Sequence, residues 1–329
     1  MASKLLAPSS NSRPRKRRGR PVNGILLLDK PIGISSNGAL QMAKRVFSAA
    51  KAGHTGNLDV LASGLLPVCF GEATKVCQFL LDADKRYLSE FTLGRRTTTG
   101  DGEGESVYER PTDNISLADV ERVVAGFRGP IEQLPPMHSA LKHKGQPLYK
   151  LAHQGIEVER QKRTVTIHGF EVLAFDNPRL EVMVSCSKGT YVRTLAEDIG
   201  EVLGCGGYVS RLRRDGVGPY QLADAWTLER LEWLAQRGEA ELDRSLLPID
   251  GALLLMPRVD LSAESSFYLE RGHPVLVPKA PTAGLLRLYD DLGRFVGVGE
   301  VLSDGRVAPR RLFRAEPAQD AGESARSSA

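Results

Sequence analysis

The sequence of 329 residues predicts a mixed α/β (α+β) protein that ends in a small β-rich module. Before residue 250, short apolar runs typical of strands alternate with apolar positions at helical spacing. After residue 250, short apolar segments are separated by Gly, Pro and Asp, with turn signals at 291–293 and 304–305. This spacing indicates a small barrel or sandwich, and the chain is long enough for more than one domain.

The predicted strands are short apolar or alternating runs bounded by turn residues. A continuous apolar run indicates a buried strand, whereas an alternating run indicates a strand buried on one face. Residues 25–28 form a continuous apolar run, and residues 180–186 alternate between apolar and polar. The four segments are residues 25–28, 65–70, 87–93 and 180–186.

The predicted helices are amphipathic, and two of them begin at side chains that suit a helix N-terminus. Ser35 and Ser36 are suited to cap the first helix. Ser116 and Asp119 form a capping box ahead of the third. The second is expected to run from Glu72 as one amphipathic helix. The apolar positions of the four helices lie within residues 40–47, 73–81, 120–127 and 192–203.

The charge is distributed unevenly along the chain. The formal net charge is +4, but residues 1–22 hold seven basic residues and no acid. The block RPRKRRGR (13–20) repels itself and is expected to be disordered. It is either a solvated tail or an attachment to nucleic acid. Because the rest of the chain is not basic overall, any nucleic-acid surface there has to be a local patch.

The composition gives no sign of a membrane or secreted protein. No run of 18 apolar residues is present, and the N-terminus lacks the apolar core of a secretory signal. The four cysteines form no CxxC pair, which indicates buried or free thiols in a reducing compartment rather than a zinc site. We therefore expect a cytoplasmic protein without membrane contact, and a monomer.

The loop GHTGNLDVLASG (53–64) places one carboxylate, Asp59, between two apolar neighbours. If this loop packs inward, Asp59 is partly desolvated, and its pKa rises unless a cation compensates. An Asx-turn or a cap is the ordinary explanation of an Asp in such a loop. Arg193, in GTYVRTLAEDIG (189–200), begins an inward-facing helix, where an arginine usually needs a carboxylate partner. The pattern alone does not make Asp59 that partner.

Four long motifs follow one another along the chain. They are GILLLDKPIGISSN (24–37), GHTGNLDVLASGLLPVCFGEATKVCQFLLDADKRY (53–87), PPMHSALKHKGQPLYKLAHQGIEV (135–158) and CSKGTYVRTLAEDIGEVLGCGGYVSRLRR (186–214). In sequence and in order they resemble the tRNA pseudouridine synthase B (TruB) family, over roughly residues 23–250. The bacterial branch fits better than the guide-RNA-dependent dyskerin branch, whose members differ around the acid.

This resemblance implies a pseudouridine synthase fold with a mainly antiparallel mixed sheet. It implies isomerisation of uridine 55 in the T-loop of tRNA to pseudouridine, with base flipping and without cofactor or metal. The implied partner is tRNA, held at its T-stem-loop and its acceptor end. The implied division is a disordered basic tail (1–22), a catalytic domain (23–250) with a thumb loop at about 130–163, a PUA-like RNA-binding domain (251–314) and a disordered tail (315–329).

The resemblance also assigns three catalytic residues. Asp59 matches the catalytic acid, which either adds to the base or sugar as a nucleophile or helps to form a glycal by removing a sugar proton. Arg193 matches the arginine that keeps this acid ionised. Tyr87 matches the tyrosine that stacks on the flipped uracil, and it is a candidate for removing the proton from C5.

Three further residues match substrate contacts of the family. Tyr191 matches a second tyrosine that touches the substrate, and Leu212 matches the apolar residue that closes the pocket. His54 matches the histidine that enters the T-loop and replaces the flipped base in the stack. Without the resemblance, core packing explains the tyrosines and Leu212 as well, and an ordinary loop histidine explains His54.

Two positions beside the acid depart from the family pattern. Asn57 stands where the family usually has a small residue, and Val60 stands where it has Pro. Val60 relaxes the constraint that Pro would place on Asp59, which keeps open a second hypothesis, an RNA-binding folding factor without catalysis. The presence of Asp59, Tyr87 and Arg193 favours the enzyme. Detection of pseudouridine in an unmodified tRNA distinguishes the two.

Overall fold

The computed structural model describes residues 19–313, within which nine strands pair into one sheet and four into another. The predicted tails therefore lie almost wholly outside the described residues. Residues 19–22, which were expected to be part of the disordered tail, instead belong to the fold. Arg20 explains this, because its guanidinium donates two hydrogen bonds to the Asp243 carboxylate, at 2.7 and 2.6 Å.

The large sheet is mixed and mainly antiparallel, as predicted. Every neighbouring pair is antiparallel except β3 and β12, which are parallel. In spatial order the strands are β1 (Gly24–Lys30), β3 (Ser63–Phe70), β12 (Gly207–Val217), β4 (Lys85–Leu93), β11 (Arg179–Cys186), β10 (Arg163–Asp176) and β7 (Gly129–Gln133), with β2 (Ala52–His54) beside β3 and β13 (Tyr220–Gln221) beside β12.

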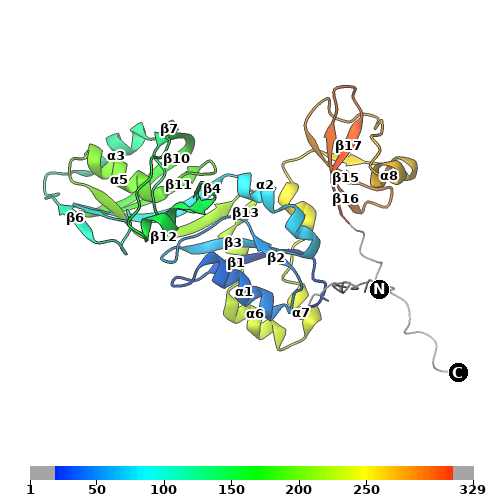
Figure 1. The fold of residues 1–329 in the computed structure, drawn as a ribbon, viewed down its shortest axis with the longest axis horizontal. Coiled ribbons are helices and arrows are strands. Elements are labelled where there is room, and N and C mark those ends of the chain that lie inside the picture. The colour runs from blue at the N-terminus through cyan, green and yellow to red at the C-terminus, as the bar shows by residue number, and fades with distance from the viewer. Residues whose placement is uncertain (1–18, 314–329) are drawn as a thin grey trace, which may run out of the picture.

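Two groups of helices cover the sheet at its two ends (Figure 1). Near β1 lie α1 (Ser36–Val46), α6 (Leu228–Ala235) and α7 (Glu239–Asp243). Near β10 and β11 lie α3 (Leu117–Gly126) and α5 (Val192–Val202). The predicted capping box of α3 is present, and Ser35 caps α1 by accepting a hydrogen bond from the Gly38 N–H.

The surroundings of strand β1 explain its continuous apolar sequence. Leu26 and Leu28 pack with α1 and α6, whereas Ile25 and Leu27 pack into the core on the opposite face. None of the four is more than 2% exposed. The continuous apolar run therefore reflects a strand that is buried on both faces.

The prediction of one continuous helix from Glu72 is wrong. It is broken into a 3-10 turn, η1 (Gly71–Lys75), and a short helix, α2 (Cys77–Asp82). At the junction the Val76 N–H bonds to the Ala73 carbonyl, a tighter three-residue step. The tighter winding buries Ala73 and Val76 but leaves Leu81 43% exposed.

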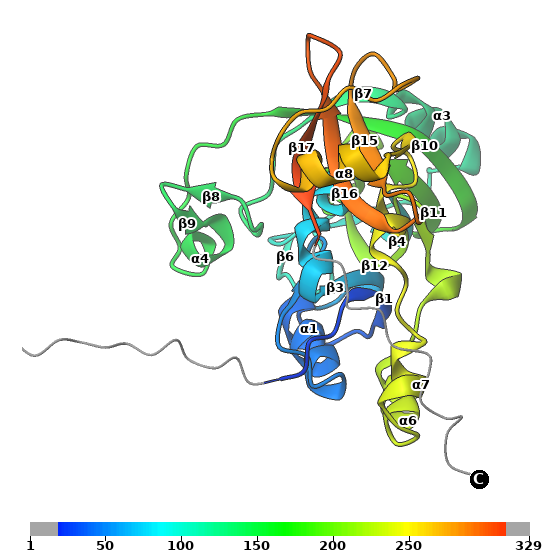
Figure 2. The ribbon, with the colours of Figure 1, turned by 90° about the vertical axis from the view of Figure 1, so that its right-hand side faces the viewer.

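The segment expected to form the thumb loop, at about residues 130–163, lies only partly outside the large sheet. Residues 130–133 belong to β7 and pair with β10, because their backbone continues the sheet. Residues 134–162, which we call the lid segment, contain β8 (Lys142–His143), β9 (Gln146–Pro147) and α4 (Leu148–Ala152). Figure 2 shows that these three elements stand apart from the sheet.

The C-terminal part forms the predicted β-rich module. Its sheet has the order β14 (Arg258–Asp260), β15 (Leu285–Tyr289), β16 (Phe295–Val301) and β17 (Val307–Leu312), with α8 (Ala263–Glu270) beside it. The expected turns separate β15, β16 and β17. The remaining elements are the β5–β6 hairpin (Arg95–Thr97 and Ser106–Glu109), η2 (Leu222–Asp224) and η3 (Ile249–Leu253).

From residue 19 to residue 313, no helix combines the length and the apolar character needed to cross a membrane.

Candidate active site

The loop that carries Asp59 joins β2 to β3 and is held at several points. The Ser36 hydroxyl, at the start of α1, accepts a hydrogen bond from the Leu58 N–H at 2.7 Å and donates one to the Leu58 carbonyl at 3.1 Å. The Gly33 N–H bonds to the Val60 carbonyl at 2.9 Å. Although Val60 replaces the Pro of the family, these bonds fix the backbone on both sides of Asp59.

The parallel pairing of β3 with β12 brings the strand after this loop against the end of β12. Gly64 lies opposite Arg214 and has a φ of +104°. A Cβ on Gly64 would lie 2.3 Å from the Arg214 carbonyl oxygen, so only glycine fits this approach. The glycine therefore allows the loop and β12 to form two walls of one cavity.

One guanidinium lies between two carboxylates at the centre of this cavity. Arg193 Nη2 is 3.1 Å from Asp59 Oδ2, and Arg193 Nη1 is 3.3 Å from Asp101 Oδ2. Arg193 and Asp101 have side chains that are only 8% and 5% exposed. The structure therefore brings Asp59 and Arg193 into the ion pair that the sequence pattern alone left open.

Asp101 and the lid segment fix the orientation of this guanidinium. Asp101 Oδ1 accepts hydrogen bonds from the Thr99 hydroxyl and from the Glu103 N–H. Arg193 also donates to the Thr99 carbonyl at 3.0 Å and to the His138 carbonyl, in the lid segment, at 2.7 Å. Its donors therefore connect the loop that carries Asp59, the turn between β5 and β6, and the lid segment.

The pKa of Asp59 is raised above its ordinary value, and burial in the cavity is the main cause. The positive charge of Arg193 opposes this rise, and the negative charge of Asp101 adds to it. The Asp59 side chain still exposes 43% of its surface, which faces the cavity. The carboxylate is therefore accessible to a ligand and is paired with a cation.

Tyr87 and Leu212 reach the cavity from neighbouring strands. Tyr87 lies near the start of β4, directly opposite Arg214 of β12. Leu212 lies two residues before Arg214 on β12, so both side chains point to the same face of the sheet. Burial raises the pKa of the Tyr87 phenol, and the nearby Arg214 opposes this rise.

Tyr191 and His54 occupy different positions relative to this cavity. Tyr191 is the N-cap residue of α5, and its backbone is held by two hydrogen bonds with the Gln133 side chain. It lines the cavity, whereas His54, at the end of β2, does not. Burial lowers the pKa of the His54 imidazole, whose Nδ1 is buried without a hydrogen-bond partner.

The cavity has a volume of about 840 Å³, enough for a nucleoside. The structure brings five of the six predicted residues to its wall and places His54 outside. The wall of the cavity includes Asp59, Tyr87, Tyr191, Arg193, Leu212 and Arg214.

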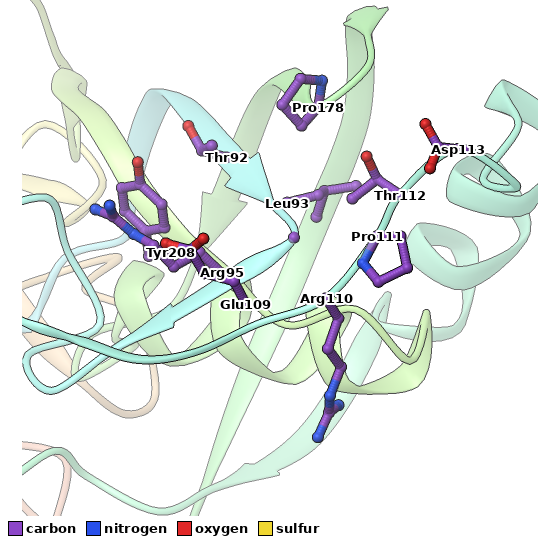
Figure 3. Close-up of a pocket in the computed structure, with 11 residues that line it drawn as sticks. Thr92, Leu93, Arg95, Glu109, Arg110, Pro111, Thr112, Asp113, Pro178 and Tyr208 are labelled. Atoms are coloured by element: carbon purple, nitrogen blue, oxygen red, sulfur yellow. The ribbon is translucent and has the colours of Figure 1, made fainter.

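A second hollow of about 560 Å³ lies at the other end of β4 (Figure 3). Arg95 stacks over the Tyr208 ring there, 4.7 Å from its centroid, and Glu109 lies beside them. It contains none of the predicted site residues. Its charged side chains are of both signs and are not focused on one point, so it is a weaker candidate for chemistry.

Among the lining residues that the sequence did not indicate, Asp101 and Arg214 make the closest contacts with the predicted ones. Asp101 lies in a polar turn that looks like any solvated loop. Arg214 lies in SRLRR (210–214), where other arginines make it inconspicuous. Only its position two residues after Leu212 indicates that its side chain points inward, because alternate residues of a strand share a face. Within the described part of the chain, no cluster of three or more His, Cys, Asp or Glu side chains is arranged to hold a metal.

Solved structures share the fold over nearly the whole chain. A crystal structure of a Cbf5-Nop10-Gar1 complex has a chain with a TM-score of 0.71 and 24% identity, with 95% of each chain covered. A chain in the structure of an H/ACA RNP bound to a substrate RNA has a TM-score of 0.69 and 22% identity, with 96% of each chain covered. Similarity at this level identifies the fold, a pseudouridine synthase fold.

Family and sequence comparisons are more specific. Residues 44–192 match the family described as TruB family pseudouridylate synthase, N-terminal domain, and residues 193–254 and 257–313 match two C-terminal domains of TruB proteins. The tRNA pseudouridine synthase B of Pseudomonas fluorescens (strain Pf0-1) is 55% identical over 302 residues, which cover 92% of this chain and 99% of the relative.

The protein of the same name from Nitrosococcus oceani is 52% identical over 299 residues, which cover 91% of this chain and 97% of the relative. The chain therefore belongs to the TruB family of pseudouridylate synthases.

Proposed function

We propose that this chain converts uridine 55 in the T-loop of tRNA to pseudouridine, by flipping the base into the cavity beside Asp59. The observation that supports this most strongly is the Asp59–Arg193 ion pair at the wall of a nucleoside-sized cavity. The names of the relatives, tRNA pseudouridine synthase B, support tRNA as the substrate.

The target base is inside a folded T-loop and has to leave its stack first. Base flipping costs a few kcal/mol, and stacking on an aromatic side chain returns about 1–3 kcal/mol. Tyr87 supplies the stacking face, while Tyr191 and Leu212 enclose the base. We assign the filling of the vacated place in the T-loop to His54, which lies outside the cavity and whose burial favours the neutral imidazole.

Asp59 then breaks the bond between N1 of uracil and C1′ of the ribose. Its carboxylate either adds to the base or sugar and later leaves, or removes a sugar proton to form a glycal. Both routes need the ionised acid. The guanidinium of Arg193 at 3.1 Å stabilises this form against the cost of burial.

After the uracil has rotated, C5 bonds to C1′ and loses its proton. Tyr87, which contacts the base, is the residue that we assign to this proton transfer. The scheme includes no metal or cofactor, because its bond cleavage, bond formation and proton transfer are assigned to the nucleotide, the Asp59 carboxylate and Tyr87.

The division of the chain follows the same proposal. Residues 23–250 form the catalytic domain, the lid segment closes over the bound stem-loop, and the C-terminal sheet grips the acceptor end. Reduced thiols and a tRNA substrate both suit the cytoplasm, where we propose that the protein acts.

The test is direct. An unmodified tRNA transcript is incubated with the protein, and pseudouridine is mapped by chemical probing at single-nucleotide resolution. We expect one new pseudouridine, at position 55, and none in a transcript whose position 55 is cytidine. Tight tRNA binding without any pseudouridine would instead support the RNA-folding hypothesis, and pseudouridine at another position would reject the assignment of the target.

A further inference from the structure

Arg214 is the one buried guanidinium of the cavity that no part of the proposed reaction yet uses. Its side chain points inward from β12 and is only 1% exposed. Nε donates to the Leu65 carbonyl at 2.8 Å, and Nη1 donates to the Asn57 carbonyl at 3.3 Å. Arg214 therefore ties together the two ends of the loop that carries Asp59.

The third nitrogen of this guanidinium, Nη2, does not bond to the backbone of that loop. Nη2 is buried and forms no hydrogen bond as close or as well aligned as those of Nε and Nη1, but the Arg214 side chain has a looser hydrogen bond with the Tyr87 phenol, which lowers the pKa of that phenol. Across residues 19–313, no carboxylate lies within ion-pair distance of Arg214. A buried cation without an anion and with a loosely bonded donor is costly, so a partner that gains negative charge during the reaction would be strongly stabilised.

The backbone register places one such partner directly opposite. Tyr87 of β4 and Arg214 of β12 are facing residues of an antiparallel pair. The Cβ atoms of facing residues are about 4.5–5.5 Å apart, and their side chains share one face of the sheet. Both line the cavity, and the positive charge of Arg214 acts on the Tyr87 phenol.

We propose that Arg214 is a positioning residue, whose Nη2 donates to the Tyr87 phenolic oxygen and holds this oxygen ready to accept the proton from C5. The proposal rests on the proposed function. In this step the phenol has first lost its proton to solvent. The phenolate oxygen takes the C5 proton, and the electron pair of the C5–H bond forms the C5=C6 bond of the ring. If Asp59 is not bonded to the base, the displaced pair of the C6=N1 bond moves to N1, which then takes a proton from water. If Asp59 has added to the base, the displaced pair leaves with the Asp59 oxygen.

Other charged and titratable groups face Tyr87, and they do not replace Arg214. The Cys186 thiol on β11 and the Asp59 carboxylate both raise the pKa of the phenol when they are ionised, and burial raises it most. Arg214 is the cation that lowers this pKa. Without it, ionisation of Tyr87 would be opposed by burial and by its acidic neighbours.

The test follows the ionisation of Tyr87 itself, without relying on activity. The full chain is labelled with 3-fluorotyrosine, and the Tyr87 fluorine resonance is identified by its disappearance in Tyr87→Phe. Its titration is then compared in the wild type, Arg214→Met and Arg214→Lys. The control is Arg211→Met, on the same strand but exposed.

We expect the titration midpoint to rise by about one pH unit or more in Arg214→Met, which means about tenfold less phenolate at a given pH. The rise should be smaller in Arg214→Lys, which keeps the charge, and absent in Arg211→Met. In single-turnover assays with unmodified tRNA, the alkaline rise of the rate should move to higher pH by the same amount. A residue that only supported the loop would slow the reaction without moving this profile.

An unmoved Tyr87 midpoint in folded Arg214→Met would overturn the proposal, and Arg214→Lys serves the same purpose if the Met variant does not fold. An unmoved midpoint with weakened tRNA binding would make Arg214 a substrate contact instead, which also overturns it. The proposed function fails differently, since a wild-type protein that forms no pseudouridine would reject the reaction but leave the fluorine titration as evidence on the Arg214–Tyr87 contact.

Discussion

Arg193 connects several parts of the candidate site. Its guanidinium contacts Asp59, Asp101 and the backbone carbonyls of Thr99 and His138. The partners come from three separate segments of the chain. Loss of one partner therefore leaves the cation paired, and this determines what a change at Asp59 should do.

Asp59→Asn should abolish pseudouridine formation but preserve the fold. The amide supplies neither a nucleophile nor a base, so we expect the single-turnover rate to fall by about a thousandfold or more. Because the pKa of Asp59 is raised, the folded protein binds this proton more tightly than the unfolded chain, and the ionised acid costs stability at neutral pH. Arg193 keeps Asp101, so the free energy of unfolding should change by less than about 1 kcal/mol.

Product is measured with excess enzyme on unmodified tRNA, and stability is measured by urea unfolding. The control is Asp113→Asn, an exposed acid at the second hollow, which should retain the wild-type rate. Substantial pseudouridine from Asp59→Asn would remove Asp59 from the mechanism.

The raised pKa of Asp59 also predicts the acid side of the pH profile. Only the ionised carboxylate performs the chemistry, so below this pKa the rate should fall more steeply, by about a further tenfold per pH unit beyond any change due to the ionisation of Tyr87. Since burial moves the pKa above the ordinary 3.8, this steeper fall should begin at a higher pH than for a solvated Asp. The single-turnover rate is measured from about pH 8 to pH 4, with circular dichroism and tRNA binding as checks. The absence of any such steepening over this range in a folded protein would contradict an essential carboxylate.

The sequence made some of these residues predictable and not others. Asp59 and Arg193 belong to long motifs, and an unpaired charge among apolar neighbours is an anomaly even in isolation. Asp101 has no such signal, because its burial arises only when the loop at 95–105 folds onto α5. Arg214 has a faint signal in the strand alternation, but its contact with Tyr87 depends on the β4–β12 register, which a single sequence does not reveal.

At the scale of elements, α1 supports the loop that carries Asp59 as well as the core. Ser36, its first residue, makes both hydrogen bonds to the backbone of Leu58, next to Asp59. Ser36→Ala would leave a buried N–H and a buried carbonyl unpaired, which costs about 1–3 kcal/mol. We expect this loss in urea unfolding, together with a single-turnover rate that is lower by about tenfold to a hundredfold, because the acid is less well positioned.

Ser35→Ala is the matched control for this prediction. Ser35 is exposed at the edge of the same cavity, and the one hydrogen bond of its hydroxyl caps the helix through the Gly38 N–H, so its loss should cost about 1 kcal/mol and leave the rate at saturating tRNA unchanged. Equal effects of both substitutions on the rate would mean that α1 acts through its general stability rather than through the contact with Leu58.

Sequence patterns over a few residues correctly predicted the elements that depend only on neighbouring residues. The capping box of α3 and the doubly buried β1 are examples, since each is determined by a few neighbouring residues. The break between η1 and α2 was missed because helical spacing alone does not show that Ala73 and Val76 pack in one apolar cluster with Leu65 and Cys69 of β3. The strand order and the parallel β3–β12 pair depend on contacts between distant segments, so only the family resemblance indicated the topology.

At the scale of the whole molecule, the C-terminal sheet shares a core with the rest of the chain. Val298 of β16 packs in one apolar cluster with Ile25 and Leu65 of the large sheet. The Lys75 ammonium, on η1, donates to the Leu312 carbonyl at 2.8 Å, and the Tyr289 hydroxyl bonds to Asp250. These contacts connect the two sheets, so changes at the ends of the chain probe RNA binding with less disturbance of the fold than removal of the C-terminal sheet would.

The basic N-terminal segment allows such a test. Residues 1–18 carry six basic side chains and no acid, whereas Arg20, the seventh, is bound to Asp243. A chain that begins at Gly19 therefore keeps the contact of Arg20 with the fold and loses six charges. If these charges contact phosphates, tRNA binding should weaken, and the slope of log affinity against log salt should become shallower by about 0.7–0.9 per lost contact, because fewer counterions are released.

The chemistry should not change in this truncated chain, because every residue of the cavity lies after Gly19. Affinity is measured by fluorescence anisotropy with labelled tRNA at a series of salt concentrations, and the rate is measured by single turnover at saturating enzyme. A full-length variant with serine at the six basic positions separates charge from length, and it should match the truncated chain. An unchanged salt slope in both variants would exclude the segment as an RNA contact, whereas a lower rate at saturation would show that it reaches the active site.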